Sequence, residues 1–406
     1  MNDNNIASKL FEHIKNLDYP RNSGSEGEKK AAKYISSIFS KYGYEPMHEK
    51  FGYFSSSPIR SVFFLIIFTG YLMLSLINLA YLDNIIVSIF TITVPILIII
   101  VFVRIDVIFK RMIKGHSKRF SKLEKMDISK KENNKSYYEC ENVIAEYNHP
   151  NYTKHLYITC HYDTISLKLP MKAFFPIIII GFLSYLGYIV LYIVEFVLKF
   201  FNLELFTSYW YIFLMLCLLA IIFLDLLLII RGFRTNVSHG SIDDATGVSI
   251  ILELTRIVKE LKPKLRITFI AFSSEEVGFY GSSYHYYKNK QLFNKETQII
   301  SIDMIGEVPP LCYVKSINPI KKIRTDNSFN QDLEKIANEC NIALKGIKFF
   351  YPGSDFAVWL LNGYKANWIY NKSRFIHSKN DKPSRINKEL ITDCFRIFVK
   401  YFEQFI

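Results

Sequence analysis

The chain has 406 residues, half of them apolar, and it carries a formal net charge of +13. These values agree only if apolar and charged residues are segregated along the chain, which excludes an evenly mixed soluble pattern. The six cysteines form no C-x-x-C pair, which excludes a disulfide framework and indicates free thiols in a reducing compartment.

The first predicted element is a helix within "SGSEGEKKAAKYISSIFSKYG", residues 23–43. Ser25 and Glu28 have the spacing of a capping box, and Gly43 stands where the helix is expected to stop. We assign residues 1–60 to the N-terminal part of a soluble domain.

Apolar runs then interrupt this domain, and none of them contains Lys, Arg, Asp or Glu. A bilayer crossing needs about 20 residues, and a buried soluble helix of that length would show a polar face. The runs therefore predict four transmembrane helices, at residues 61–82, 85–103, 174–194 and 205–224.

The predicted spans form two hairpins, with turns around Asp83 and at residues 199–205. We place the hairpins at residues 61–110 and 172–231, and the soluble domain continues at 111–171 and 232–406. The outer ends of both hairpins are rich in Lys and Arg, and the N-terminus has no signal-peptide core. The positive-inside rule thus predicts a multi-pass protein whose soluble part lies in the cytoplasm.

A basic run follows the second predicted span, from Arg104 to Lys125. It could anchor the topology and touch anionic headgroups, or it could bind nucleic acid. Its position next to a span and its lack of interleaved aromatic residues favour lipid over nucleic acid. Bundled spans also make a homo-oligomer plausible.

The soluble sequence alternates between short β-rich runs and helical patterns. Expected strands are 141–147, 156–162, 265–272, 297–305, one ending near Tyr351, and 365–370; expected helices are 246–261, 327–340, one from Ser354 and one from Asn387. This alternation predicts an α/β fold with a central, largely parallel mixed sheet flanked by helices. In such sheets, functional sites form at the carboxyl ends of the strands.

Acids and histidines occur where these strands end. They are His161 and Asp163, Glu275 and Glu276, Asp303, the pair Asp243 and Asp244 before a helix, and His377 and Asp381 near the C-terminus. Carboxylates gathered at one edge would repel one another unless a cation held them. Mixed His and carboxylate ligands suit zinc, although Mn²⁺ or Co²⁺ could occupy such a site.

These residues lie in ordered motifs that resemble the co-catalytic two-zinc aminopeptidase family, which includes bacterial leucyl aminopeptidases and glutamate carboxypeptidase. The family order is H-x-D, G-x-x-D-x-x-[ST]-G, E-E-x-G-x-x-G-S, D-M, Y-x-x-S-D and a late His. This chain has "HYD", "GSIDDATG", "EEVGFYGS", "DM", "YPGSD" and "FIH" in that order. The resemblance covers nearly all of the soluble sequence, and its fold is of the zinc-exopeptidase type.

The resemblance implies a role for each matching residue. Asp243 would bridge two Zn²⁺ ions, with His161 and Asp303 on one ion and Glu276 and His377 on the other. Glu275 would be the general base, Asp163 would orient His161, and Tyr351 would stabilise the tetrahedral intermediate. The resemblance also implies a cis peptide bond at Asp244. His239 and His285 match no ligand position and are predicted to be structural.

The resemblance favours an aminopeptidase that removes N-terminal residues from a peptide substrate. A carboxypeptidase and a glutaminyl cyclase-like enzyme of the same fold stay open as alternatives. A non-catalytic receptor or scaffold would have lost ligands, and none is lost here. A transporter is disfavoured because the predicted spans carry no charged residue at their centres. Phe356 and Lys382 depart from the family pattern and leave the substrate pocket undefined.

Overall fold

The structure is a computed structural model, and it describes residues 3–55, 59–82, 84–127, 136–168, 171–201, 203, 208–232, 234–318 and 320–406. Contacts within the chain divide it into two units. Unit 1 comprises Met1–Ser55, Ile105–Ser166 and Thr235–Ile406. Unit 2 comprises Ser56–Arg104 and Leu167–Arg234. Unit 2 is therefore made of two insertions into the sequence of unit 1.

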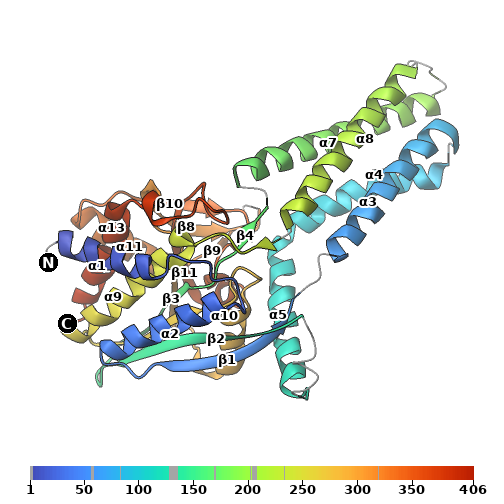
Figure 1. Ribbon diagram of the computed structural model, residues 1–406. Coiled ribbons are helices and arrows are strands. Elements are labelled where there is room, and N and C mark those ends of the chain that lie inside the picture. Colours follow the sequence, from blue (N-terminus) through green and yellow to red (C-terminus); the bar gives the residue numbers. More distant parts are fainter. Residues whose placement is uncertain are drawn as a thin grey trace. The chain divides into compact units, whose positions relative to one another are not determined.

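Unit 1 is built on a sheet with the strand order β1-β2-β6-β3-β7-β11-β8-β10, and β9 pairs with β8 (Figure 1). The strands are β1 (Met47–Phe54), β2 (Tyr137–Asn148), β3 (Lys154–His161), β6 (Leu265–Phe272), β7 (Gln298–Ile302), β8 (Val308–Ile317), β9 (Ile323–Arg324), β10 (Leu344–Phe349) and β11 (Lys365–Lys372). Strands β6, β3, β7 and β11 run parallel at the centre. β1 pairs antiparallel with β2, β2 with β6, and β8 with β11, whereas β10 runs parallel to β8. The predicted mixed α/β sheet is thus confirmed.

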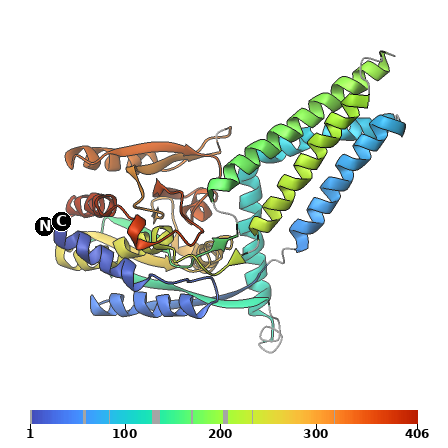
Figure 2. The same ribbon diagram turned by 45° about the horizontal axis from the view of Figure 1, so that its top comes forward.

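Helices cover both faces of this sheet (Figures 1 and 2). One apolar core includes residues of α1 (Asp3–Asn16), α2 (Glu26–Lys41), α9 (Thr246–Leu261), α11 (Asn327–Glu339) and α13 (Lys388–Glu403). The other includes residues of α5 (Ile105–Glu124), α10 (Tyr280–Asn289) and α12 (Phe356–Leu360). The single-turn helices η2, η3 and η4 lie at Ser241–Ala245, Lys290–Leu292 and Pro383–Arg385.

The central strands are buried on both faces, which explains why they read as nearly continuous apolar runs. On β6, Phe269 and Ala271 belong to the first core, whereas Ile270 and Phe272 belong to the second. Successive side chains of a strand point to opposite faces, so each run supplies both helix layers at once. The polar residues that follow these strands are then held at one rigid edge.

Local capping also follows the predicted chemistry. The Ser25 side chain accepts from the backbone N–H of Glu28 at 3.3 Å, and a Glu28 carboxylate oxygen accepts in return from Gly24 at 2.5 Å. The Ser25 contact is the cap predicted for α2. The Glu28 carboxylate binds the N–H of Gly24, whereas in a full capping box it would bind the N–H of the cap residue itself. Asn387 caps α13 in the same manner, by accepting from the N–H of Glu389 at 2.9 Å.

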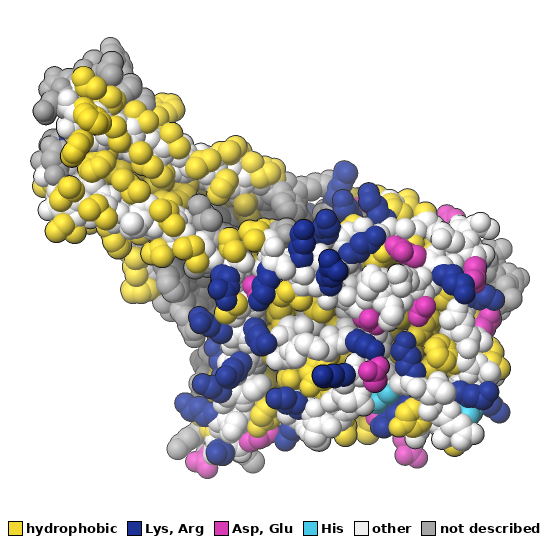
Figure 3. Space-filling model, turned by 180° about the vertical axis from the view of Figure 1, so that it is seen from behind, with side chains coloured by type: hydrophobic (Ala, Val, Ile, Leu, Met, Phe, Trp, Pro, Cys, Tyr) yellow, Lys and Arg dark blue, Asp and Glu magenta, His cyan; other side chains and the backbone are white. Residues whose placement is uncertain are grey.

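Unit 2 consists of the helices α3 (Ile59–Ile77), η1 (Asn78–Leu82), α4 (Ile85–Val103), α7 (Met171–Phe200) and α8 (Ser208–Gly232). Most of their described surface is apolar (Figure 3). Their polar side chains bind one another in the interior: Asn78 donates to Ser88 at 2.9 Å, and Ser75 shares a 2.6 Å hydrogen bond with Tyr188. Polar groups that bond between helices suit an apolar solvent.

Four transmembrane helices were predicted, but among the described residues one helix is long and apolar enough to cross a membrane, Pro176–Phe200 in α7. The apolar parts of the other three are shorter, at Ile66–Ile77, Ile85–Leu97 and Ile212–Leu227. The predicted turns fall partly on residues 83, 202 and 204–207, which lie outside the described residues.

Several elements of unit 1 had no counterpart in the sequence prediction, namely α1, β1, α5, α10, β8 and β9. The basic run at residues 104–125 forms α5, which packs within unit 1 and is not merely a flank of a span. A short two-stranded ladder of β4 (Ser166–Leu167) and β5 (Arg234–Thr235) joins the two ends of the second insertion.

Candidate metal centre

Parallel pairing brings the candidate residues to one edge of the sheet. β3 lies between β6 and β7 and runs parallel to both, so the carboxyl ends of all three meet at this edge. His161 is the last residue of β3, Asp303 follows β7 directly, and Glu276 follows β6 after a short bend. Asp243 comes from η2, and His377 comes from the loop after β11.

The side chains of these residues converge in two groups that share Asp243. In the first group, His161 Nε2 lies 3.0 Å from Asp243 Oδ1 and 3.5 Å from Asp303 Oδ1. In the second, His377 Nε2 lies 3.0 Å from Asp243 Oδ2 and 3.1 Å from Glu276 Oε2. Each carboxylate oxygen of Asp243 thus faces a different histidine. This is the arrangement expected of a carboxylate that bridges two cations.

The separations fit zinc. Zinc bonds of about 2.0–2.1 Å in a tetrahedron place neighbouring ligand atoms about 3.3 Å apart. The ligand atoms of each group all lie within 4.8 Å of one another. Glu276 Oε1, Asp303 Oδ1 and His377 Nδ1 are buried without a hydrogen-bond partner among the described residues. Buried polar atoms are normally satisfied, so the carboxylate oxygens indicate that a cation belongs here.

Asp163 fixes the orientation of the His161 ring. His161 Nδ1 lies 3.2 Å from the Asp163 carbonyl and 3.5 Å from its Oδ1, so Nε2 is turned to the ligand group. The Asp163 carboxylate also accepts from the backbone N–H of Glu275 at 3.0 Å and of Glu276 at 3.3 Å. Asp163 thus holds the histidine and the Glu275–Glu276 bend together, as partners behind metal ligands commonly do.

The loop that carries Asp243 is held from both sides. The Asp381 carboxylate accepts from the N–H of Ile242 at 2.6 Å and of Asp243 at 3.3 Å. The Asp244 carboxylate accepts from the N–H of Gly247 at 2.8 Å and of Met304, next to Asp303, at 3.2 Å. The peptide bond between Asp243 and Asp244 is cis, as the resemblance implied.

Two glycines of the motifs lie where the backbone approaches neighbouring atoms too closely to leave room for a side chain. A Cβ on Gly247 would lie 2.3 Å from Asp244 Oδ2 and 2.4 Å from the Ile302 carbonyl. A Cβ on Gly281 would lie 2.2 Å from the Ser273 carbonyl. Both glycines therefore let the N-terminal turn of a helix pack directly against the strand ends that carry the acids.

Positive backbone φ angles recur at the site. They occur at Ser274, before Glu275 (φ 59°), at Met304, after Asp303 (φ 62°), and at His377 itself (φ 58°). Non-glycine residues seldom adopt this region, and such strain concentrates at functional sites.

Arg21 links the segments that carry the ligands, and sequence reasoning assigned it no role. Its guanidinium is fully buried and donates to backbone carbonyls: Tyr162 at 2.8 Å, His239 at 2.6 Å, Gly240 at 2.9 Å, Tyr19 at 3.2 Å, and Leu17. Tyr162 lies between His161 and Asp163, and Gly240 precedes the loop of Asp243. Arg21 therefore joins the two ligand segments that flank the second insertion. Burial lowers its pKa, and the charges of nearby acids oppose that shift.

Without a cation the acids of this edge are electrostatically strained. Burial raises the pKa of Glu275 well above its usual range and that of Glu276 to about 7. Burial also opposes ionisation of Asp243, but hydrogen bonds with His161 and His377 lower the pKa of Asp243 overall. A metal that binds here must therefore displace protons from carboxylates.

Of the two other predicted catalytic residues, Glu275 lies at the site and Tyr351 is exposed. Glu275 is nearly buried at 9% exposure, next to the ligand Glu276. Tyr351 is 42% exposed on the loop after β10, with its ring 5.6 Å from that of Phe349, and it is not one of the clustered ligands. Asp355 is a buried acid that the sequence prediction did not use. Its Oδ1 has no hydrogen-bond partner among the described residues, and burial raises its pKa to about 8.

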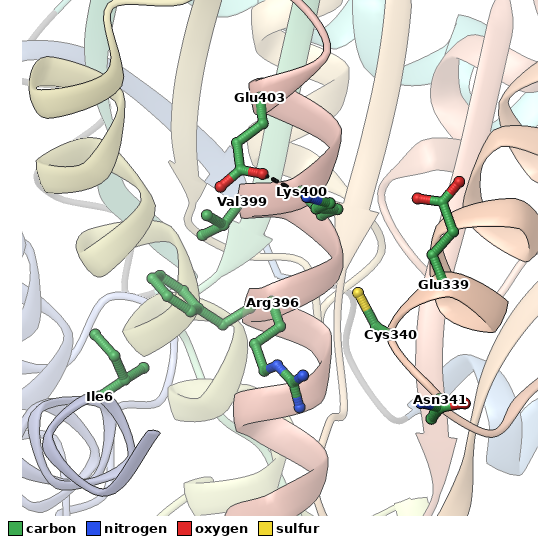
Figure 4. Close-up of a pocket in the computed structure, with 9 residues that line it drawn as sticks. Ile6, Glu339, Cys340, Asn341, Arg396, Val399, Lys400 and Glu403 are labelled. Carbon is green, nitrogen blue, oxygen red and sulfur yellow. Dashed lines mark hydrogen bonds and ion pairs between the residues drawn. The ribbon is translucent and has the colours of Figure 1, made fainter. Parts of the chain in front are cut away.

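Histidines outside the family pattern bind elsewhere. His239 Nδ1 lies 2.7 Å from Asp18, and His285 Nδ1 lies 3.1 Å from Glu49. A separate cavity of about 470 Å³ lies between α1, α11 and α13 (Figure 4). It is lined by residues such as Ile6, Cys340 and Lys400, and the clustered ligands take no part in it.

Residues 229–402 match the sequence profile of Peptidase family M28. A curated relative, a "Probable zinc metalloprotease" of Pyrenophora teres f. teres, is 42% identical over 69 residues, which is 16% of this chain and 14% of the relative. "Aminopeptidase YwaD" of Bacillus subtilis is 37% identical over 71 residues, 17% of this chain and 15% of the relative. The matched segment thus spans about one seventh of the length of these relatives.

Solved structures support the fold over a much larger part of the chain. The aminopeptidase from Aneurinibacillus sp. strain AM-1 superposes with a TM-score of 0.53. The comparison covers 98% of this chain and 93% of that one, at 16% sequence identity. The overall likeness is therefore one of fold, whereas the sequence match falls on the half of unit 1 that carries Asp243, Glu276, Asp303 and His377.

Proposed function

We propose that the chain is a member of Peptidase family M28 and, more specifically, a membrane-anchored aminopeptidase that holds two zinc ions. The observation that carries the proposal is the pair of ligand groups sharing Asp243. His161 and Asp303 would complete one ion, and Glu276 and His377 the other.

Each residue at the edge has a proposed task. When bound, the zinc ions would lower the pKa of a water molecule and polarise the scissile carbonyl. The Glu275 carboxylate takes a proton from that water and passes it to the leaving amine. Asp163 holds the His161 ring, and Tyr351 hydrogen-bonds the developing oxyanion.

The membrane part of the proposal rests on the apolar insertions. α7 contains a segment long and apolar enough for one span, and we propose that α3, α4, α7 and α8 cross the bilayer as two hairpins. The basic flanks would place unit 1 in the cytoplasm. Peptides are the proposed substrates, the bilayer is the proposed environment, and the bundled helices allow self-association. Protease protection in sealed vesicles tests the orientation, and cleavage of unit 1 from the outer face would contradict it.

Metal content and single substitutions test the site. Purified protein should hold two equivalents of zinc, and His377→Ala should lose at least one. His239→Ala is the matched control, because its ring binds Asp18, and it should keep both. Glu275→Gln should keep zinc but lose activity by about 10²–10⁴-fold. Full activity in Glu275→Gln would show that the general base lies elsewhere.

Blocked peptides separate the alternatives. An aminopeptidase should cleave a peptide with an amidated C-terminus and spare one with an acetylated N-terminus. A carboxypeptidase should show the reverse preference. A glutaminyl cyclase-like enzyme should release ammonia from an N-terminal glutamine without cleaving a peptide bond.

A further inference from the structure

α5 is an amphipathic helix with a cationic outer face, and its inner face is fixed to unit 1. The His116 ring stacks on Tyr280 with centroids 4.2 Å apart, and His116 Nδ1 lies 3.2 Å from Ser283 Oγ. Phe120 packs edge-on against Tyr284 at 5.0 Å. Arg119 donates to the Tyr280 hydroxyl at 2.9 Å. These contacts fix the rotation of the helix and thereby determine which side chains face outward.

The outward side chains form a row of exposed cations, Lys110, Lys114, Lys118 and Lys122, with Arg111 beside them. We name these five residues the α5 row. The lysines are four residues apart, so they stand above one another on one side of the helix. None of the five makes an ion pair with any residue in the described ranges. The acids of α5 are already engaged, Asp106 with Lys321 at 2.9 Å and Glu124 with Lys288 at 2.8 Å.

This arrangement is unfavourable for the isolated helix. Like charges four residues apart destabilise a helix by about 0.2–0.5 kcal/mol per pair, and the row contains three such pairs of lysines. At about 1.5 Å of rise per residue, the row from Lys110 to Lys122 is about 18 Å long. A single small anion cannot neutralise a row of that length, so its chemistry fits an extended anionic surface.

The position of α5 in the chain identifies that surface. α4 ends at Val103 and α5 begins at Ile105, so the row follows a proposed membrane helix almost immediately. Basic side chains gather on unit 1, in contrast to the apolar surface of unit 2 (Figure 3). Ile108, next to the row, is also exposed at 44%. Cations with an apolar neighbour at the end of a span match the interface of an anionic bilayer.

We propose that the α5 row is a docking surface for anionic phospholipid headgroups, through which unit 1 rests on the membrane. The inference depends on the membrane anchoring proposed above but not on peptidase activity. It adds an electrostatic contact of the catalytic unit itself to the anchoring by apolar helices. α5 packs on Tyr280, the first residue of the helix α10 that follows the Glu275–Glu276 bend.

Amine labelling of the full-length protein in vesicles tests the proposal directly. The protein is reconstituted into phosphatidylcholine vesicles with or without phosphatidylglycerol, acetylated under limiting conditions, and mapped by mass spectrometry. The four lysines of the row should react about five-fold more slowly in anionic vesicles, the ratio that corresponds to about 1 kcal/mol per cation near such a surface. Added salt should remove the difference. Equal labelling in both vesicle types would overturn the proposal.

Controls distinguish binding of lipid from binding of other anions, and distinguish both from a failure of the protein to insert into the membrane. Lys33, Lys41, Lys295 and Lys335 are exposed on other elements and should label equally in both vesicle types. Protection of the row by RNA in detergent, without protection in anionic vesicles, would replace lipid with nucleic acid as the partner. Failure to co-float with neutral vesicles would instead contradict the membrane anchoring.

A thermal measurement provides a second readout. In neutral detergent, added phosphatidylglycerol should raise the Tm of the wild type more than phosphatidylcholine does, because a ligand of the native state stabilises it. Replacing the four lysines of the row by Gln should abolish this difference. Replacing the four control lysines by Gln should keep it, and an equal gain in the row variant would refute the assignment.

Discussion

Removal of the Arg21 guanidinium should destabilise unit 1 by an amount comparable with its whole folding free energy. The change Arg21→Met keeps much of the side-chain volume but removes the donor of the Tyr162, His239 and Tyr19 carbonyls. The Gly240 and Leu17 carbonyls each keep a backbone N–H donor. A buried polar group left unsatisfied costs about 1–3 kcal/mol, so the three carbonyls together cost about 3–9 kcal/mol. A domain is typically stable by about 5–15 kcal/mol.

Urea unfolding followed by tryptophan fluorescence measures this loss, since Trp359 and Trp368 are both buried in unit 1. Arg21→Met should be unfolded or nearly so without denaturant. Arg21→Lys keeps the charge but not the planar fork, and it should fall between Met and the wild type. Arg266→Met is the matched control, because Arg266 pairs with the exposed Glu146 at 3.6 Å and its loss should cost about 1 kcal/mol. A loss below about 1 kcal/mol in Arg21→Met would refute the reasoning.

Two further predictions concern pH and packing. Burial opposes the ionisation of the Glu253 carboxyl group. Hydrogen bonds with His13, Tyr42 and Arg256 outweigh this effect and lower the pKa of Glu253 to about 2. The ionised Glu253 therefore stabilises the fold fully above its unfolded pKa, and this stabilisation is lost as the pH falls towards 2. In Glu253→Gln the free energy of unfolding, measured between about pH 5 and 2, should fall less steeply with decreasing pH than in the wild type. An unchanged pH dependence would contradict the assignment. Gly247→Ala should lower the Tm and the zinc content, because its Cβ would lie 2.3 Å from Asp244 Oδ2 and overpacking costs about 1–3 kcal/mol. Gly115→Ala, on α5 with no atom within 4 Å of its Cβ, should leave zinc unchanged and stabilise by about 0.5–1 kcal/mol; zinc loss in both variants would show that the close contact is not the cause.

The parts of the site that were predictable are those that depend on local pattern. Runs such as 156–162 and 265–272 are apolar on both faces, which identifies central strands, and polar residues after such strands must meet at one edge. The prediction thus brought His161, Glu276 and Asp303 together. The Ser25 cap of α2 was equally predictable, because the cap and the Glu28 N–H that it accepts from lie within one helical turn.

The parts that were missed depend on distant contacts. Arg21 lies in a segment that the family resemblance included, but its role comes from hydrogen bonds to the backbone carbonyls of residues 162, 239 and 240. Every residue has a backbone carbonyl whatever its type, so the sequence does not reveal these partners. The strands β1 and β8 alternate less clearly because each is exposed over part of its length. The basic run that forms α5 was interpreted by its charge, its position next to a predicted span and its lack of interleaved aromatic residues, not by its apolar periodicity. Its buried stripe, which includes Ile113, His116 and Phe120, decides its place in unit 1.

The second insertion interrupts the chain between two candidate ligands, His161 and Asp243, yet the edge that holds them is intact. The ends of the insertion are joined on the unit 1 side, where Ser166 Oγ donates to the Thr235 carbonyl at 2.6 Å and Asn22 donates to the same oxygen at 3.0 Å. Closing a longer loop costs only about 0.6 kcal/mol for each doubling of its length. Once these bonds and Arg21 fix the two ends, the length of chain between them has little influence on the ligand geometry. An α/β fold can therefore accept a long insertion between two ligand segments, provided that the closure is made by residues outside the insertion, as it is here.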